Sequence, residues 1–169
     1  MPISPYLVRL REQVGHQLLV VPSVTAAVLD DAGRLLLVRH SNGGVWVAPG
    51  GSLEPDELPA DGVVRETWEE TALLVEPVRL IGVYAGPEFR VRYPNGDEVS
   101  YVMSVFACRL LAGIPEPDAV ETLEVGYFSE PEIAQLATPA WLRVVLPDVL
   151  AAGDVARFAA RRWQPPRLG

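Results

Sequence analysis

The chain has 169 residues, of which 49% are hydrophobic and 21% charged, so it is long enough to form one domain with a buried core. Its formal net charge of −8 would repel a polyanion, which argues against a nucleic acid polymer as partner. No apolar run reaches the ~18 residues that a membrane span requires, and the amino terminus lacks the pattern of a secretory signal. Cys108 is the only cysteine, which excludes an intrachain disulfide and suits a reducing compartment. We therefore expect a cytoplasmic protein with a single domain over residues 1–169 and no membrane partner.

The amino-terminal half is expected to combine helices with strands. Ser4-Pro5 is a favourable helix start, and the apolar stripe that follows predicts a helix within residues 1–16. Segments rich in branched aliphatic side chains predict strands at residues 18–30, 34–40 and 45–51. The first two of these are separated by a short turn and should form a β-hairpin or two neighbouring strands. The third runs into a glycine-rich turn, after which residues 59–73 should form a helix.

The carboxyl-terminal half is predicted to contain strands followed by helices. The strands are expected at residues 79–86, 88–111 and 125–129. Asn95-Gly96 predicts a two-residue hairpin turn within the second of them. Helices are expected at residues 131–137, 139–152 and 155–163, so that residues 138–169 form a helical extension. Strands in the middle with helices at both ends indicate an α/β or α+β sandwich around a mixed sheet.

An acidic cluster lies on the helix predicted at residues 59–73. Glu66 is three residues before Glu69 and four before Glu70, so the three carboxylates share one face of that helix. They would repel one another unless a cation neutralised them, and carboxylate oxygens are the ligands that Mg²⁺ prefers. The alternative is a solvated helix face, which is the usual explanation for helical glutamates taken alone.

The spacing around this cluster is more specific than the cluster itself. It runs Gly51, five residues, Glu57, seven residues, Arg65-Glu66, two residues, and Glu69-Glu70. Over Gly51–Leu73 the sequence resembles the signature of the Nudix hydrolases, and the resemblance extends over residues 22–135. Two positions depart from the family pattern, since Ala72 stands in place of glycine and Thr67 in place of an apolar residue. The resemblance implies an α/β/α sandwich around a mixed β-sheet, with the amino- and carboxyl-terminal helices as extensions.

The resemblance also implies a role for each residue of the signature. It implies that Glu66, Glu69 and Glu70 bind Mg²⁺, or Mn²⁺ in its place. The same three glutamates would also be catalytic. Either Glu69 or Glu70 would activate water. Glu57 would be an outer or additional ligand, the Gly50 carbonyl oxygen a further ligand, and Arg65 an orienting catalytic residue. In many family members a later loop supplies the catalytic base, for which Glu121 and Glu124 are the candidates; a solvated strand edge explains these two equally well.

Substrate contacts are predicted from residues outside the signature. Phe89 and Tyr93 would form a wall on which a base stacks, and Arg90 or Arg92 would hold a distal phosphate. Arg39, at the end of a predicted strand, is a further candidate for substrate binding, whereas the neighbouring His40 is expected to be a surface residue. The alternative for the aromatic residues is that they belong to the core, as is more usual for aromatics that alternate along a strand.

The function implied by the resemblance is cleavage of the diphosphate linkage in a nucleoside diphosphate derivative, such as ADP-ribose or a nucleotide sugar. Water would attack one phosphorus atom, with Mg²⁺ neutralising the diphosphate. Two alternatives stay open, which are a nucleoside triphosphate pyrophosphohydrolase and a nucleotide-sensing module without turnover. In each case the partner is a small nucleotide, and the assembly of the chain into a homodimer is left open.

Overall fold

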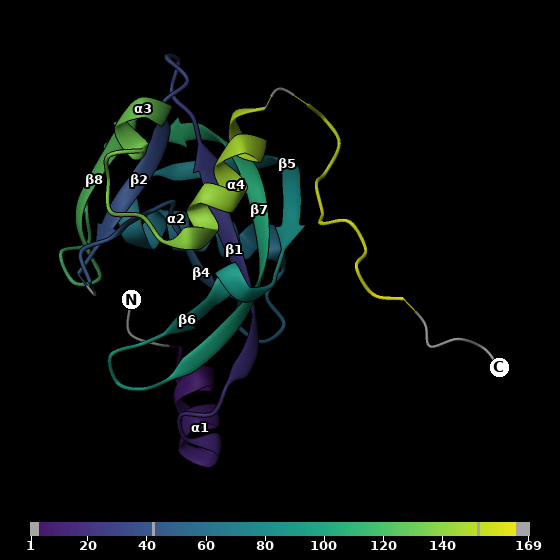
Figure 1. The fold of residues 1–169 in the computed structure, drawn as a ribbon. Helices are drawn as coiled ribbons and strands as arrows, with labels where there is room; N and C mark the ends of the chain where they lie inside the picture. Colours follow the sequence, from purple (N-terminus) through teal and green to yellow (C-terminus); the bar gives the residue numbers. More distant parts are fainter. Residues whose placement is uncertain (1–3, 42, 152, 165–169) are drawn as a thin grey trace.

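The computed structural model describes residues 4–41, 43–151 and 153–164, and within them two β-sheets lie between helices (Figure 1). The larger sheet has the strand order β4-β1-β7-β5, with β6 also paired to β7, and the smaller sheet has the order β3-β2-β8. The strands are β1 (Leu19–Val28), β2 (Leu35–His40), β3 (Trp46–Val47), β4 (Gly50–Ser52), β5 (Leu74–Tyr84), β6 (Arg90–Arg92), β7 (Glu98–Ala112) and β8 (Thr122–Phe128). The helices in the same ranges are α1 (Pro5–Val14), α2 (Pro59–Thr71), α3 (Glu130–Ile133) and α4 (Ala140–Leu150), with a 3₁₀ turn η1 (Pro87–Phe89). Among these, no helix is long and apolar enough to cross a membrane.

Strand β1 lies at the centre of the larger sheet. It pairs in parallel with β7 along its whole length and antiparallel with β4. The predicted hairpin with β2 is wrong, because the chain leaves the larger sheet after β1 and enters the smaller one, with an isolated bridge between Leu29 and Leu35. Residues Ser23–Val28 are all buried, as expected for a strand covered on both faces and not for one half of an exposed hairpin.

Each face of the larger sheet is covered by a different helix. On one face, Val63 of α2 packs with Val24 and Val28 of β1. On the other face, Leu142 and Val145 of α4 pack in a cluster that also contains residues of β5, β7 and the smaller sheet. Helices on both faces of a mixed sheet confirm the predicted α/β/α sandwich.

Helix α2 begins and ends with unfavourable local chemistry. Its N-cap, Leu58, provides no side-chain hydrogen bond, although Pro59 is well suited to the first helical position. At the other end Ala72 has φ 55°, a left-handed conformation that usually requires glycine. One face of the helix is buried against the larger sheet through Val63, and Leu73, just after the helix end, is buried in the same cluster. This packing therefore stabilises the helix more than its own sequence does.

The carboxyl-terminal prediction is partly wrong. The helix expected at residues 139–152 is α4, but the one expected at residues 131–137 is only the short α3. The segment at residues 155–163 is not helical: it is irregular, and Arg157 forms a bridge with Gly82 at the outer edge of β5. There the Arg157 amide donates to the Ile81 carbonyl oxygen at 2.7 Å, and Arg157 accepts from the Val83 amide at 3.1 Å. Unpaired backbone groups at a sheet edge thus outweigh the local preference of this segment for helix.

The position of the turn predicted at Asn95-Gly96 is confirmed, but its loop is Pro94-Asn95-Gly96 and not two residues, because Tyr93 pairs with Asp97. It joins β6 to β7, and Gly96 has φ 93°. The Gly96 amide donates to the Tyr93 carbonyl oxygen at 2.9 Å, and the Tyr93 amide donates to Asp97 at the same distance. This β6–β7 hairpin projects from the sandwich next to α1 (Figure 1). The helix predicted within residues 1–16 is α1.

Candidate active site

The signature residues meet where β4 lies against α2. The Gly50 amide donates to Glu70 Oε2 at 3.0 Å. A Cβ on Gly51 would lie 2.5 Å from the Glu66 carboxylate, and one on Gly62 would lie 2.5 Å from Leu53 and 3.1 Å from Glu57. Glycine is needed at both positions so that strand, loop and helix can approach closely enough to bring the carboxylates together. The Gly62 that weakens the helix by its propensity therefore makes room for the loop that carries Glu57.

Arg65 connects the carboxylates of the site. Its Nε and one terminal nitrogen donate to the two oxygens of Glu57 at 2.6 and 2.8 Å. Its other terminal nitrogen donates to Glu66 at 2.9 Å and to Glu69 at 3.0 Å. The first guanidinium contact lowers the pKa of Glu57, and the carboxylates raise the pKa of Arg65. Arg65 thus contacts three of the predicted carboxylates, with the main-chain carbonyl of Ser52 as an additional acceptor at 3.2 Å.

Glu66 and Glu70 are the buried carboxylates of the site. Glu70 is 3% exposed, and burial raises its pKa to about 8, with the charge of Glu66 adding to the effect. Burial also raises the pKa of Glu66, although Arg65 opposes this. His40 Nε2 lies 3.5 Å from Glu70 Oε1, and burial lowers the pKa of that imidazole. Buried carboxylates with raised pKa values would be stabilised as anions by a cation.

The chemistry of these donors fits Mg²⁺. Carboxylate oxygens are hard ligands, and Glu66 and Glu70 supply them at the cavity wall, while Glu69 is paired with Arg65. Among the described residues, no three acidic, histidine or cysteine side chains converge on one point, because Glu69 is turned to Arg65. Glu69 would have to rotate away from the guanidinium to join Glu66 and Glu70 around an ion.

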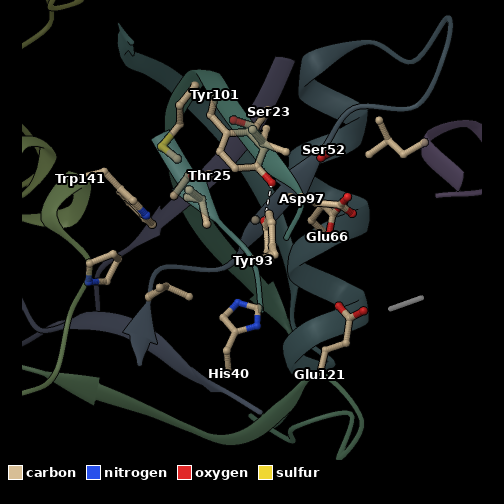
Figure 2. Close-up of a pocket in the computed structure, with 18 of the residues that line it drawn as sticks. Ser23, Thr25, His40, Ser52, Glu66, Tyr93, Asp97, Tyr101, Glu121 and Trp141 are labelled. Atoms are coloured by element: carbon tan, nitrogen blue, oxygen red, sulfur yellow. Dashed lines mark hydrogen bonds between the residues drawn. The ribbon is translucent and has the colours of Figure 1, made fainter. Parts of the chain in front are cut away.

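The loop before β8 brings Glu121 to the same cavity. Asp118 Oδ1 accepts hydrogen bonds from the backbone amides of Val120, Glu121 and Thr122 at 2.8–3.0 Å. The Thr122 hydroxyl lies 2.9 Å from the Glu70 carbonyl oxygen, which ties the loop to the end of α2. The anchored loop places Glu121 in the cavity lining (Figure 2).

The cavity itself has a volume of about 830 Å³. Its floor is the larger sheet, where Ser23 and Thr25 of β1 lie beside strand β7. Figure 2 shows the paired hydroxyl groups of Tyr93 and Tyr101, 2.6 Å apart, at the centre of the site. Glu66 lies to one side of this pair and Trp141 of α4 to the other; His40 and Glu121 lie below.

The other residues predicted to bind substrate lie elsewhere, except for Tyr93 and Arg92. Phe89 is 2% exposed and stacks on Tyr84 in the core, so it cannot form a wall for a base. Arg90 forms an ion pair with Glu98 on the β6–β7 hairpin and does not line the cavity. Arg39 pairs with Glu124 on the neighbouring strand, and neither residue lines the cavity. Of the two candidate bases, Glu121 is therefore the one in the cavity lining.

His40 is a cavity residue that the sequence did not predict. The pairing of β2 with β8 shifts register between Arg39 and His40. Such an irregularity redirects the side chain that follows it, and a strand pattern of alternating faces gives no sign of it. Trp141 is a further cavity residue outside the predicted set, and it also packs in the core.

Comparisons with known proteins show to which family the chain is similar. The model of the NUDIX domain matches residues 20–149. A MutT-like protein of Streptomyces ambofaciens is 33% identical over 135 residues, which is 80% of either chain. An ADP-ribose pyrophosphatase of Methanocaldococcus jannaschii is 30% identical over 116 residues, or 65% of this chain and 67% of that one.

A solved structure shows the same fold. The crystal structure of the MutT protein of Methanosarcina mazei Go1 matches with a TM-score of 0.60 and 26% identity, over 77% of this chain and 92% of that one. The matched region contains the glycine-rich turn, α2 and the loop of Glu121. The protein is therefore an enzyme of the Nudix hydrolase family.

Proposed function

We propose that this enzyme is a Mg²⁺-dependent hydrolase that cleaves the diphosphate linkage of a nucleoside diphosphate derivative, such as ADP-ribose or a nucleotide sugar. The observation that carries the proposal is the pair of buried carboxylates, Glu66 and Glu70, held by Gly50, Gly51 and Arg65 at the wall of a large cavity. The relative named as an ADP-ribose pyrophosphatase supports the substrate class.

Each residue has a distinct task in this proposal. Bound Mg²⁺, or Mn²⁺, would neutralise the diphosphate and lower the pKa of water. Glu66, Glu69 and Glu70 would hold the ion, with the Gly50 carbonyl as a further ligand, and Arg65 would fix the direction of the carboxylates through Glu57. Glu121 is the candidate that accepts the proton of the attacking water, because its loop is anchored to the end of α2.

The cavity end near Trp141 and His40 is the proposed site for the base. Trp141 offers the large aromatic surface there, and a neutral imidazole can donate or accept a hydrogen bond at the edge of a base. The nucleoside would then lie to one side of Glu66 and Glu70, and the diphosphate would lie against these two carboxylates. The single buried cysteine fits a reducing compartment, and we place the enzyme in the cytoplasm.

The test is to measure turnover of a panel of substrates in the presence of Mg²⁺ or Mn²⁺, with release of nucleoside monophosphate as the readout. The panel contains ADP-ribose, nucleotide sugars, dinucleoside polyphosphates and nucleoside triphosphates. Glu69→Gln and Glu70→Gln should each lower kcat by at least about 100-fold, and the matched surface change Glu76→Gln should not. Turnover restricted to nucleoside triphosphates would select the alternative pyrophosphohydrolase. Nucleotide binding without any turnover would instead indicate a sensing module.

A further inference from the structure

We propose that α1 and the turn of the β6–β7 hairpin form a second lobe of the active-site cavity, and that this lobe binds the sugar of a nucleoside diphosphate sugar. The inference rests on the proposed hydrolase function and adds to it the group beyond the diphosphate. We define the sugar lobe as the part of the cavity lined by Ser4, Leu7, Arg11, Ser23, Arg92 and Asn95.

Helix α1 lies outside the part of the chain that matches the family, which begins at residue 20. It nevertheless lines the same cavity as Glu66 and Glu70, through Leu7 and Arg11. No residue of α1 is buried, so the helix adds little to the core. Its main contribution to the molecule is therefore a wall of the active-site cavity, beside the projecting hairpin (Figure 1).

Polar contacts hold this wall in place. Arg11 donates to the carbonyl oxygens of Gly15, Gln17 and Glu98 at 3.1, 2.6 and 2.9 Å. Asp97, in the hairpin, lies 2.7 Å from His16 Nδ1 and 3.6 Å from Arg11 Nε. At the start of α1, the Ser4 hydroxyl donates to Glu54 at 3.0 Å. The Arg11 guanidinium is thus committed to bracing the lobe, and other groups must bind the ligand.

The groups left for a ligand are hydrogen-bond donors. Ser23 is 3% exposed, and its hydroxyl has no hydrogen-bond partner among the described residues. A buried hydroxyl without a partner is costly, so a ligand that pairs with it gains that energy on binding. The Tyr93 and Tyr101 hydroxyls pair at 2.6 Å, and Ser52 also hydrogen-bonds to Tyr101, so this pair is already engaged. Arg92 is 76% exposed at its side chain, and its nearest carboxylate, Glu98, lies 3.9 Å away.

The balance of charges selects a sugar over a third phosphate or a second base. The lobe has one weakly engaged cation, Arg92, but the carboxylates of Glu54 and Asp97 line the same cavity next to it. A highly charged phosphate would be repelled by these carboxylates, whereas sugar hydroxyls accept from the donors and donate to the carboxylates. The total volume of about 830 Å³ lies near the upper end of the ~300–1,000 Å³ range of ligand pockets. It leaves room for a group beyond the nucleoside and diphosphate.

The test compares substrates with and without the sugar, using Ser23→Ala and Arg92→Gln. The matched control is Arg9→Gln, an exposed change on α1 that does not line the cavity. Ser23→Ala and Arg92→Gln should each raise KM for ADP-ribose or an ADP-hexose about tenfold with kcat within a factor of two, as expected for one lost hydrogen bond. Calorimetry without divalent cations gives a readout free of turnover: the affinity for ADP-ribose should fall about tenfold, and that for ADP should not change.

Equal effects on ADP-ribose and ADP, or no effect on either, would overturn the sugar lobe. Turnover of nucleoside triphosphates but of no nucleotide sugar would also overturn it, and would select the alternative pyrophosphohydrolase over the proposed diphosphate substrate. If nothing in the panel is cleaved, the hydrolase proposal fails, and the calorimetric comparison still decides whether the lobe binds a sugar. Thermal unfolding of each variant checks that the fold is retained.

Discussion

Arg65 is the residue around which the acidic site is arranged, since one guanidinium holds Glu57, Glu66 and Glu69. A lysine has the charge but not the planar set of donors. Arg65→Lys should therefore lower kcat/KM by about 10–100-fold, as for other residues that orient a metal ligand. Steady-state kinetics check this, with Arg34→Lys as the control because Arg34 forms a surface ion pair with Asp30. Equal losses in both variants would contradict a special role for Arg65.

Gly51 tests how tightly the site is packed. A methyl group there would lie 2.5 Å from the Glu66 carboxylate, so either β4 or Glu66 must move. Gly51→Ala should lower kcat by about 100-fold and the free energy of unfolding by about 1–3 kcal/mol. Gly153→Ala is the control, because a Cβ at Gly153 meets nothing within 4 Å. Retained activity in Gly51→Ala would show that the position of Glu66 is not essential.

At this scale the sequence predicted the signature well and the substrate contacts poorly. The spacing of Glu57, Arg65 and the helix glutamates identifies a set that the structure brings together. Phe89 is a core residue because η1 turns its ring toward Tyr84, and His40 reaches the cavity through an irregularity in β2. Both outcomes depend on tertiary packing, which a pattern of residue types does not encode.

Among the elements, α2 ends with a residue that fits its conformation badly. Ala72 has φ 55° and ψ 20°, where a side chain has a steric cost of about 1–2 kcal/mol that glycine avoids. Ala72→Gly should raise the free energy of unfolding by about 0.5–1 kcal/mol, after the greater entropy loss of glycine is subtracted. The control is Ala151→Gly at the end of α4, where φ is −72° and glycine should destabilise. Denaturant unfolding of both variants checks the opposite signs.

The attachment of α1 to the β6–β7 hairpin should depend on pH through Asp97. The hydrogen bond from His16, followed by the one from Asn95 and by the charge of Arg11, keeps the pKa of Asp97 below its usual value despite desolvation by burial. The stabilisation is thus present above the unfolded pKa of about 3.9 and is lost as the pH falls through the lower folded value. We expect hydrogen-exchange protection of the α1 amides to fall in that window, before the sandwich unfolds.

The corresponding variant is Asp97→Asn, which should reduce protection of α1 about tenfold at pH 7. Asp31→Asn, in an exposed turn, is the control. Protection of α1 that is unchanged in Asp97→Asn would show that its other contacts suffice.

The carboxyl-terminal segment shows where element prediction fails. Residues 155–163 have a composition that suits a helix, yet the segment is irregular because β5 offers backbone partners at Ile81 and Val83. The outcome is decided by the position of β5 in the sheet, which is a property of the whole fold.

For the whole molecule, the class of fold was predictable but the pairing of strands was not. Apolar strands between helices indicate a sandwich, and the family resemblance specifies which one. The parallel pairing of β1 with β7 joins segments about 80 residues apart, from Leu19↔Val99 to Val28↔Cys108. No local sequence signal predicts such a long-range pairing, whereas the turn residues of the β6–β7 hairpin predict that hairpin.

The net charge of −8 and the two buried carboxylates predict that Mg²⁺ stabilises the whole molecule. A ligand at 100 times its Kd adds about 2.7 kcal/mol to the free energy of unfolding. Saturating Mg²⁺ should therefore raise Tm by several degrees in the wild type but much less in Glu66→Gln. Sodium chloride at equal ionic strength is the control for general screening of the negative charge. The same rise in Tm with sodium chloride alone would contradict a specific Mg²⁺ site.

The irregular segment at residues 155–163 has a consequence for how the protein behaves in a crowded solution. By bonding to Ile81 and Val83, it occupies part of the outer edge of β5, where another molecule could otherwise add a strand. A chain shortened before Arg157 would present that edge, beside the exposed Val78 and Val83, as a template for intermolecular sheet growth. The segment thus protects the sandwich from aggregation even though it contributes little to its core.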